Sequence, residues 1–160
     1  VLAKIGDGGK VCIYTEAGTD LIADVNGYVP AGGSMGTLVP ARLLETRTGP
    51  NDVTVDGLFE GIGRQGAGTT VELKVTGRGG VPGDAEAVML NVAAVSPDGI
   101  GFLTVFPCGS DLPKASNVNY GPGDVVANAV LAKIGDGGKV CIYTEAGTDL
   151  IADVNAFQTG

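Results

Sequence analysis

The residues with the clearest chemical potential are three cysteines, Cys12, Cys108 and Cys141. The chain has no histidine, so the commonest general base and the commonest zinc ligand are both missing from its sequence. No pair of cysteines has the CxxC spacing of a soft-metal site. The cysteines therefore indicate disulfide chemistry, with buried free thiols as the alternative.

Two short motifs match catalytic or cofactor patterns but lack the context that those patterns need. Residues 61–66 fit GxGxxG, yet a strand pattern follows them where a dinucleotide site needs a helix. Residues 32–36 fit GxSxG, but no histidine exists to activate the serine. The carboxylates of Asp149 and Asp153 cannot be placed in one pocket from sequence. We therefore predict no enzyme, no catalytic residue and no organic cofactor.

Aspartates recur in turns, where oxygen-rich loops can bind Ca²⁺. They include Asp98, Asp111, Asp124 and Asp136. Their spacing matches neither an EF-hand nor a calcium-binding nonapeptide repeat, so we expect solvated turn residues, with a bound Ca²⁺ as the alternative. A second charged group, Arg42, Glu45 and Arg47, crowds one short segment, and we expect it to form a structural ion-pair cluster, with a ligand site as the alternative.

The charge balance narrows the choice of partners. The chain carries 18 acidic and 10 basic residues, for a net charge of −8. An acidic chain without a basic cluster is repelled by phosphate backbones and anionic lipid, and no apolar run approaches the roughly 18 residues of a membrane span. We therefore expect neither nucleic-acid binding nor membrane insertion.

A long internal repeat organises the chain. Residues 1–26 read VLAKIGDGGKVCIYTEAGTDLIADVN, and residues 130–155 repeat all 26 letters, 129 residues later. This offset is the length of a small domain rather than of a solenoid turn. We predict that 1–26 is the C-terminal hairpin segment of a preceding identical repeat, 27–39 a linker, and 40–160 one complete module that ends a tandem array.

The module reads as all-β. Glycine makes up 28 of 160 residues and aromatics only 5%, which favours thin layers joined by tight turns. Strand patterns cover 69–76, 87–95, 102–106 and 125–134, and a hairpin is expected from 139–144 and 148–154. We predict an antiparallel β-sandwich of eight or nine strands, jelly-roll or immunoglobulin-like, with a closed barrel or a trefoil as alternatives.

Several stretches together resemble a known repeat. They are PARLLETRTG (40–49), GVPGDAEAVMLNV (80–92), GFLTVFPCG (101–109), SNVNY (116–120) and 128–155 with its GKVCIYT and DLIADVN. These are similar to a repeat unit of large secreted and cell-surface proteins of actinobacteria. The resemblance implies an extracellular location and tandem modularity, and it carries over no catalytic or binding residue.

The cysteines agree with an extracellular location. Cys12 and Cys141 occupy the same position of the two copies, so one module owns two cysteines. We predict a Cys108–Cys141 disulfide, and we expect Cys12 to pair with a preceding module. Disulfides imply oxidising surroundings.

Two functions remain from sequence. The first is a non-catalytic structural or adhesive module that joins other copies of itself head-to-tail, by strand complementation or exchange. The second is a carbohydrate-binding module that contacts surface polysaccharide through Asn117, Asn119 and Tyr120. The shortage of aromatic residues, with no tryptophan, argues against a broad stacking platform for sugars.

Overall fold

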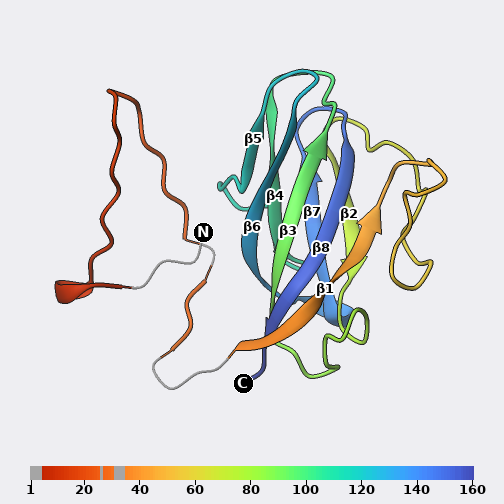
Figure 1. Cartoon of the computed structure of the whole chain (residues 1–160), viewed down its shortest axis with the longest axis horizontal. Helices are drawn as coiled ribbons and strands as arrows, with labels where there is room; N and C mark the ends of the chain where they lie inside the picture. Colours follow the sequence, from red (N-terminus) through yellow and green to blue (C-terminus); the bar gives the residue numbers. More distant parts are fainter. Residues whose placement is uncertain (1–4, 26, 31–34) are drawn as a thin grey trace.

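The computed structural model describes residues 5–25, 27–30 and 35–160 and shows a sandwich of two antiparallel sheets (Figure 1). One four-stranded sheet has the order β1-β8-β3-β6, and the other has the order β2-β7-β4-β5. The strands are β1 (Met35–Glu45), β2 (Thr69–Lys74), β3 (Ala87–Val95), β4 (Gly101–Pro107), β5 (Val118–Tyr120), β6 (Val125–Lys133), β7 (Lys139–Thr144) and β8 (Asp149–Gln158). The predicted all-β sandwich is confirmed, and its two sheets do not close into a barrel.

Alternating side chains explain why these segments form strands. Along β8, Leu150, Ala152 and Val154 are fully buried, while the residues between them are half-exposed. This period of two places every second side chain between the sheets. The core that results contains seven leucine and isoleucine side chains with no exposed surface: Leu43, Leu44, Leu73, Leu90, Leu103, Ile142 and Leu150.

The hairpin predicted for 139–144 and 148–154 is wrong. Both segments are strands, but β7 pairs with β2 and β4 while β8 pairs with β1 and β3, so the chain crosses from one sheet to the other. The crossing is fixed by tertiary contacts. The Ala146 amide donates to the hydroxyl of Tyr120 at 3.1 Å, and the Thr148 hydroxyl donates to the carbonyl of Val95 at 3.0 Å.

The predicted linker 27–39 overlaps a strand, because β1 begins at Met35. Met35 lies opposite Gln158 of β8, and a side chain at Gly36 would overlap the ring of Phe157. Gly36 and Pro40 of this strand are residue types that favour a linker. They are tolerated because β1 is an edge strand with two irregularities of register. Residues 31–34 of the predicted linker lie outside the described residues.

Arg78 holds the long loop between β1 and β2 against the sandwich. Its side chain is 5% exposed, and its Nε and Nη2 atoms each lie 2.7 Å from the carboxylate of Asp56. It also donates to the carbonyls of Leu43, Lys74 and Leu58 at 2.8–3.1 Å. One guanidinium therefore joins the loop to the ends of two strands.

We predict that the ion pair of Arg78 and Asp56 contributes to the free energy of unfolding in an acid-sensitive way. Hydrogen bonds from Arg78 lower the pKa of Asp56 from 3.8 to about 2. Because the folded-state pKa is depressed, the stabilisation is complete above pH about 4 and is lost as the pH falls toward about 2. In urea titrations, the stability difference between wild type and Asp56→Asn should shrink across this window. A difference that stays constant from pH 6 to pH 2 would contradict the assignment.

Candidate functional site

Two copies of one sequence lie in two different environments. We call residues 1–26 the N-terminal copy and residues 130–155 the C-terminal copy. Both contain the same short turn, η1 (Asp7–Gly9) in the first and η2 (Asp136–Gly138) in the second. The central glycines have φ angles of 69° and 66°, and in each turn the preceding glycine donates to the carbonyl of the following lysine at 2.8 Å. The turn is therefore encoded locally.

The C-terminal copy supplies an inner strand to each sheet. β7 lies between β2 and β4, and β8 lies between β1 and β3. We call these two inner positions the acceptor slot. A body without the segment that fills the slot would expose the edges of four strands and both faces of its core.

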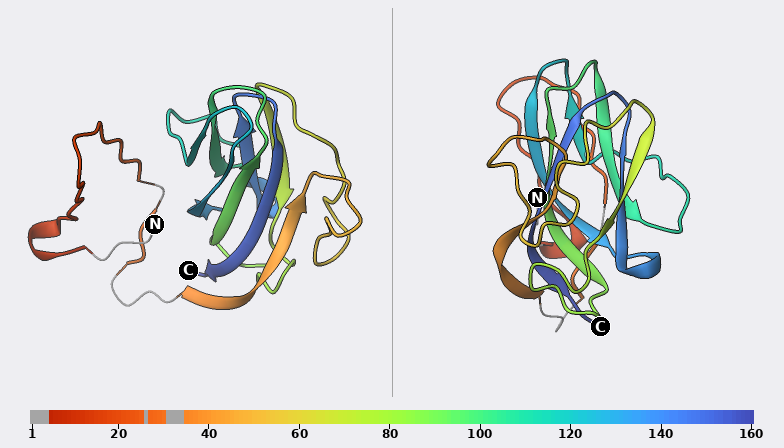
Figure 2. Two further views of the ribbon diagram at one scale, coloured as in Figure 1. Left: turned by 45° about the horizontal axis from the view of Figure 1, so that its top comes forward. Right: turned by 90° about the vertical axis from the view of Figure 1, so that its right-hand side faces the viewer.

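The N-terminal copy forms no strand in its described residues, 5–25, and runs beside the sandwich (Figure 1 and Figure 2). Four apolar side chains of the C-terminal copy are fully buried: Val140, Ile142, Leu150 and Val154. Their counterparts are 54%, 58%, 57% and 90% exposed: Val11, Ile13, Leu21 and Val25. The same residues thus form core in one copy and surface in the other. Residues 1–4 and 26 lie outside the described part of the chain.

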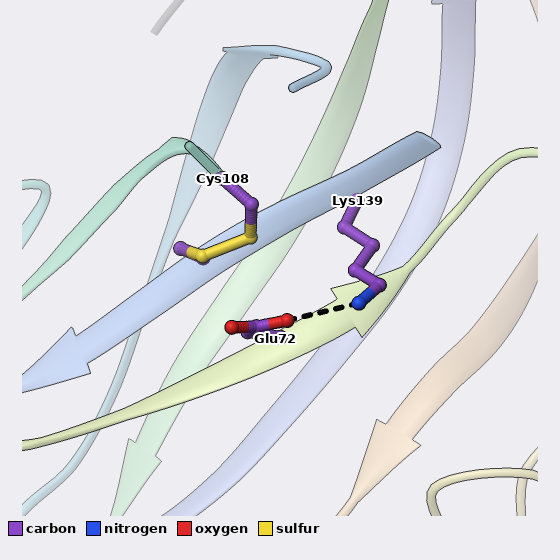
Figure 3. The surroundings of a disulfide bond; sticks show 4 residues. Glu72, Cys108 and Lys139 are labelled. Atoms are coloured by element: carbon purple, nitrogen blue, oxygen red, sulfur yellow. Dashed lines mark hydrogen bonds and ion pairs between the residues drawn. A yellow bond between two sulfur atoms is a disulfide. The ribbon is translucent and has the colours of Figure 1, made fainter. Parts of the chain in front are cut away.

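The disulfide joins the C-terminal copy to the body. Cys108, just after β4, is bonded to Cys141 of β7 with 5.0 Å between the Cα atoms, as predicted. A Glu72–Lys139 ion pair of 2.9 Å lies beside it (Figure 3). Both bonded cysteines are buried, whereas Cys12 is free and exposed. The buried disulfide indicates an oxidising environment. The pairing of Cys12 with a preceding module stays a prediction.

The charged segment at the end of β1 forms the expected structural ion-pair cluster. Glu45 is fully buried and accepts from Arg42 at 2.9 Å and from Arg47 at 2.8 Å. Burial alone would raise the pKa of Glu45, but hydrogen bonds from Arg47 outweigh it and leave that pKa below its ordinary value. Arg42 also pairs with Asp153 of β8 at 2.9 Å, so the cluster fastens β1 to the strand that fills the slot.

The two carboxylates of β8 are both engaged in structural contacts. While Asp153 pairs with Arg42, Asp149 accepts from the hydroxyl of Thr46 at 2.8 Å and from Arg64 at 3.1 Å. Arg64 in turn binds the crossing between β7 and β8 through the carbonyl of Gly147, at 3.0 Å. These contacts position the segment that fills the slot.

The three residues suggested for glycan contact do not share an exposed face. Tyr120 is 5% exposed, with its hydroxyl 2.8 Å from that of Thr144, so its ring cannot stack on a sugar in this structure. Asn117 is 6% exposed and accepts from the amide of Val105 at 2.6 Å. Only Asn119 is exposed, because β5 alternates inward and outward. The suggestion is thus wrong for Tyr120 and Asn117.

A different aromatic pair lies near Asn119. Phe102 of β4 and Tyr143 of β7 have ring centroids 5.9 Å apart, and the Tyr143 hydroxyl donates to Glu145 at 2.7 Å. A hollow of about 530 Å³ adjoins them, and Ile22 of the N-terminal copy contributes to its wall. Sequence reasoning missed this pair because its members belong to different strands. The sequence signal that could have indicated the pair is that Phe102 and Tyr143 each occupy an outward position of their strand.

Two of the turn aspartates bind other groups of the protein. Asp124 accepts from the amide of Gly121 at 2.7 Å, and Asp98 pairs with Arg64 at 2.7 Å. Among the residues that the structure describes, no three His, Cys, Asp or Glu side chains gather as a metal site. The GxGxxG match at 61–66 lies in the loop before β2, a strand. Of the GxSxG match, residues 32–34 are outside the described residues.

Comparisons with protein-family models, curated proteins and solved structures found no match to this chain. Within the described ranges, no helix has the length and apolar character needed to span a membrane.

We predict that the disulfide-bonded Cys108 and the free Cys12 contribute unequally to the free energy of unfolding. Cys108→Ser removes a bond that spans 33 residues and should lower the free energy of unfolding by about 3–4 kcal/mol. Cys12→Ser should change it by less than about 0.5 kcal/mol, because this thiol is free and exposed. Urea unfolding without reductant measures both. An equal loss in the two variants would contradict the assigned pairing.

Proposed function

We propose that this chain is a non-catalytic extracellular repeat module that extends or assembles a surface protein or fibre by joining further copies of itself head-to-tail. The observation that carries the proposal is the second copy of the slot-filling segment. A module needs one such segment, yet a spare copy precedes the body with its core residues exposed. A spare copy is expected where one repeat follows another.

An extracellular location is supported by two independent features. The buried Cys108–Cys141 disulfide suits an oxidising environment. The sequence stretches of the body also resemble a repeat unit of secreted and surface proteins. The charged cluster at the end of β1 serves the fold, since Arg42 pairs with both Glu45 and Asp153. A structural role accounts for these groups without assigning chemistry to them.

The proposal has a direct consequence for solution behaviour. Residues 1–160 contain one acceptor slot and two copies of the segment that fills it, so one copy stays outside the slot of this module. The exposed copy presents apolar side chains and unpaired backbone, which favour pairing with another chain. Because such a contact is head-to-tail, it does not close on itself and can propagate.

We predict that the chain self-associates with rising concentration and that deletion of residues 1–30 abolishes this association. Light scattering over a concentration series measures the mass of both proteins. The matched control keeps the full length and replaces by serine the four exposed residues of the N-terminal copy whose counterparts are fully buried: Val11, Ile13, Leu21 and Val25. This control should be monomeric. A full chain that stays monomeric at high concentration, with residues 5–25 resistant to protease, would contradict the proposal.

Carbohydrate binding is the second candidate, now at a different place. Phe102 and Tyr143 form the aromatic pair, and Asn119 and Glu145 border the same hollow with an amide and a carboxylate. Such a combination suits ring stacking with hydrogen bonds to hydroxyl groups. The pair is only half-exposed, which limits the stacking area.

A glycan array separates the two candidates. If the module binds sugar, Phe102→Ala should remove the signal by shortening the stacking surface, while Val125→Ala, an exposed substitution on β6, should keep it. If the module is purely structural, wild type and both variants give no signal. Binding that survives Phe102→Ala would show that this pair is not the site.

A further inference from the structure

The start of β1 and the end of β8 are neighbours. Met35 pairs with Gln158 and Gly36 with Phe157 in an antiparallel register. The residues that correspond to Gln158 and Phe157 at the 129-residue offset are Val29 and Tyr28, which follow the N-terminal copy directly. If residues 20–29 occupied the β8 position, Val29 would therefore lie opposite Met35.

Only five residues, 30–34, connect Val29 to Met35 in the sequence. Their sequence is PAGGS, and loops of about 2–5 residues with glycine are typical of β-hairpins. The N-terminal copy thus precedes β1 at the spacing that a hairpin between the β8 position and β1 requires. A protein whose ends lie side by side is also the usual case in which circular permutation is tolerated.

We propose that the N-terminal copy can complete its own module, so that residues 10–15 take the place of β7 and residues 20–29 take the place of β8. The module then has two alternative completions within one chain. The inference goes beyond the role of the module as a spacer and does not depend on it.

The contacts favour neither completion strongly. From Val1 to Asn26 the two copies are identical, so every core contact of β7 and most contacts of β8 are reproduced. The sequences differ after this point, where Gly27, Tyr28 and Val29 replace Ala156, Phe157 and Gln158. In the alternative completion Tyr28 would place an aromatic ring at Gly36, where Phe157 lies now. The backbone bond from Glu86 to the carbonyl of residue 158 asks nothing of the side chain there.

The disulfide reports which copy occupies the slot. Cys12 corresponds to Cys141, so the alternative completion brings Cys12 to Cys108 in place of Cys141. In the present structure Cys12 is free, and the Cys108–Cys141 bond holds the C-terminal copy in place. Removal of Cys141 leaves the N-terminal copy as the only one that can gain a disulfide in the slot.

The test is the full-length Cys141→Ser variant, purified as a monomer without reductant. Peptide mapping should recover most of Cys108 linked to Cys12 of the same chain. In wild type, peptides that end at 157–160 should be protected from hydrogen exchange. In the variant, the protection should instead be found in peptides that end at 28–30. The matched control is the same variant with residues 31–34 deleted. Only one residue then connects Val29 to Met35, which is too short for the hairpin. The Cys12–Cys108 link should therefore be absent from the monomer of this control.

Three results would overturn the proposal. They are free Cys108 and Cys12, a Cys12–Cys108 link found only between chains, and a link within the chain without the transfer of exchange protection. If Cys141→Ser does not fold, wild type refolded from the reduced denatured state replaces it. A fraction of its monomers should carry the Cys12–Cys108 link, and its complete absence would equally overturn the proposal. None of these results bears on self-association through the copy left outside the slot.

Discussion

The sandwich depends on one segment that supplies an inner strand to both of its sheets. β7 joins β2 to β4, β8 joins β1 to β3, and only a short crossing separates the two strands. Other contacts of the module converge on this segment. The disulfide from Cys108 reaches β7, the Arg42–Asp153 ion pair reaches β8, and Arg64 binds the carbonyl of Gly147 at the crossing. Neither sheet is continuous without the segment, so the two layers must form together.

The duplicated sequence separates local from tertiary causes of structure. Both copies adopt the same Gly-rich turn, because the turn needs only its own backbone and glycines at positive φ. Within the described part of both copies, only the copy in the slot forms strands. Burial of each valine, leucine or isoleucine side chain contributes about 1.5–3 kcal/mol, and four such residues gain it only in the slot. The ladder hydrogen bonds likewise need neighbouring strands. The sequence of the segment thus allows it to form strands, and contacts with the body determine which of the two copies does so.

Sequence patterns predicted the fold class and most strands because alternation and turn residues are local signals. They failed where the decisive contact is distant. Residues 35–39 of β1 fall in the predicted linker, because the irregular register and the edge position of this strand are not visible in the local sequence. The strands of the C-terminal copy are predicted as one hairpin, because only contacts such as that of Tyr120 show the crossing. The disulfide followed from the repeat period. The aromatic pair of Phe102 and Tyr143 did not, because it is assembled from two strands.

The most direct test of the account is hydrogen exchange of the oxidised wild-type chain, read in peptides that extend beyond the identical sequence and so identify each copy. The account predicts that peptides covering 139–158 exchange slowly, as inner strands of two sheets, whereas peptides covering 10–29 exchange at nearly the rate of an unfolded chain. Equal protection of the two copies, or stronger protection of the N-terminal one, would contradict the claim that a single slot decides which copy folds.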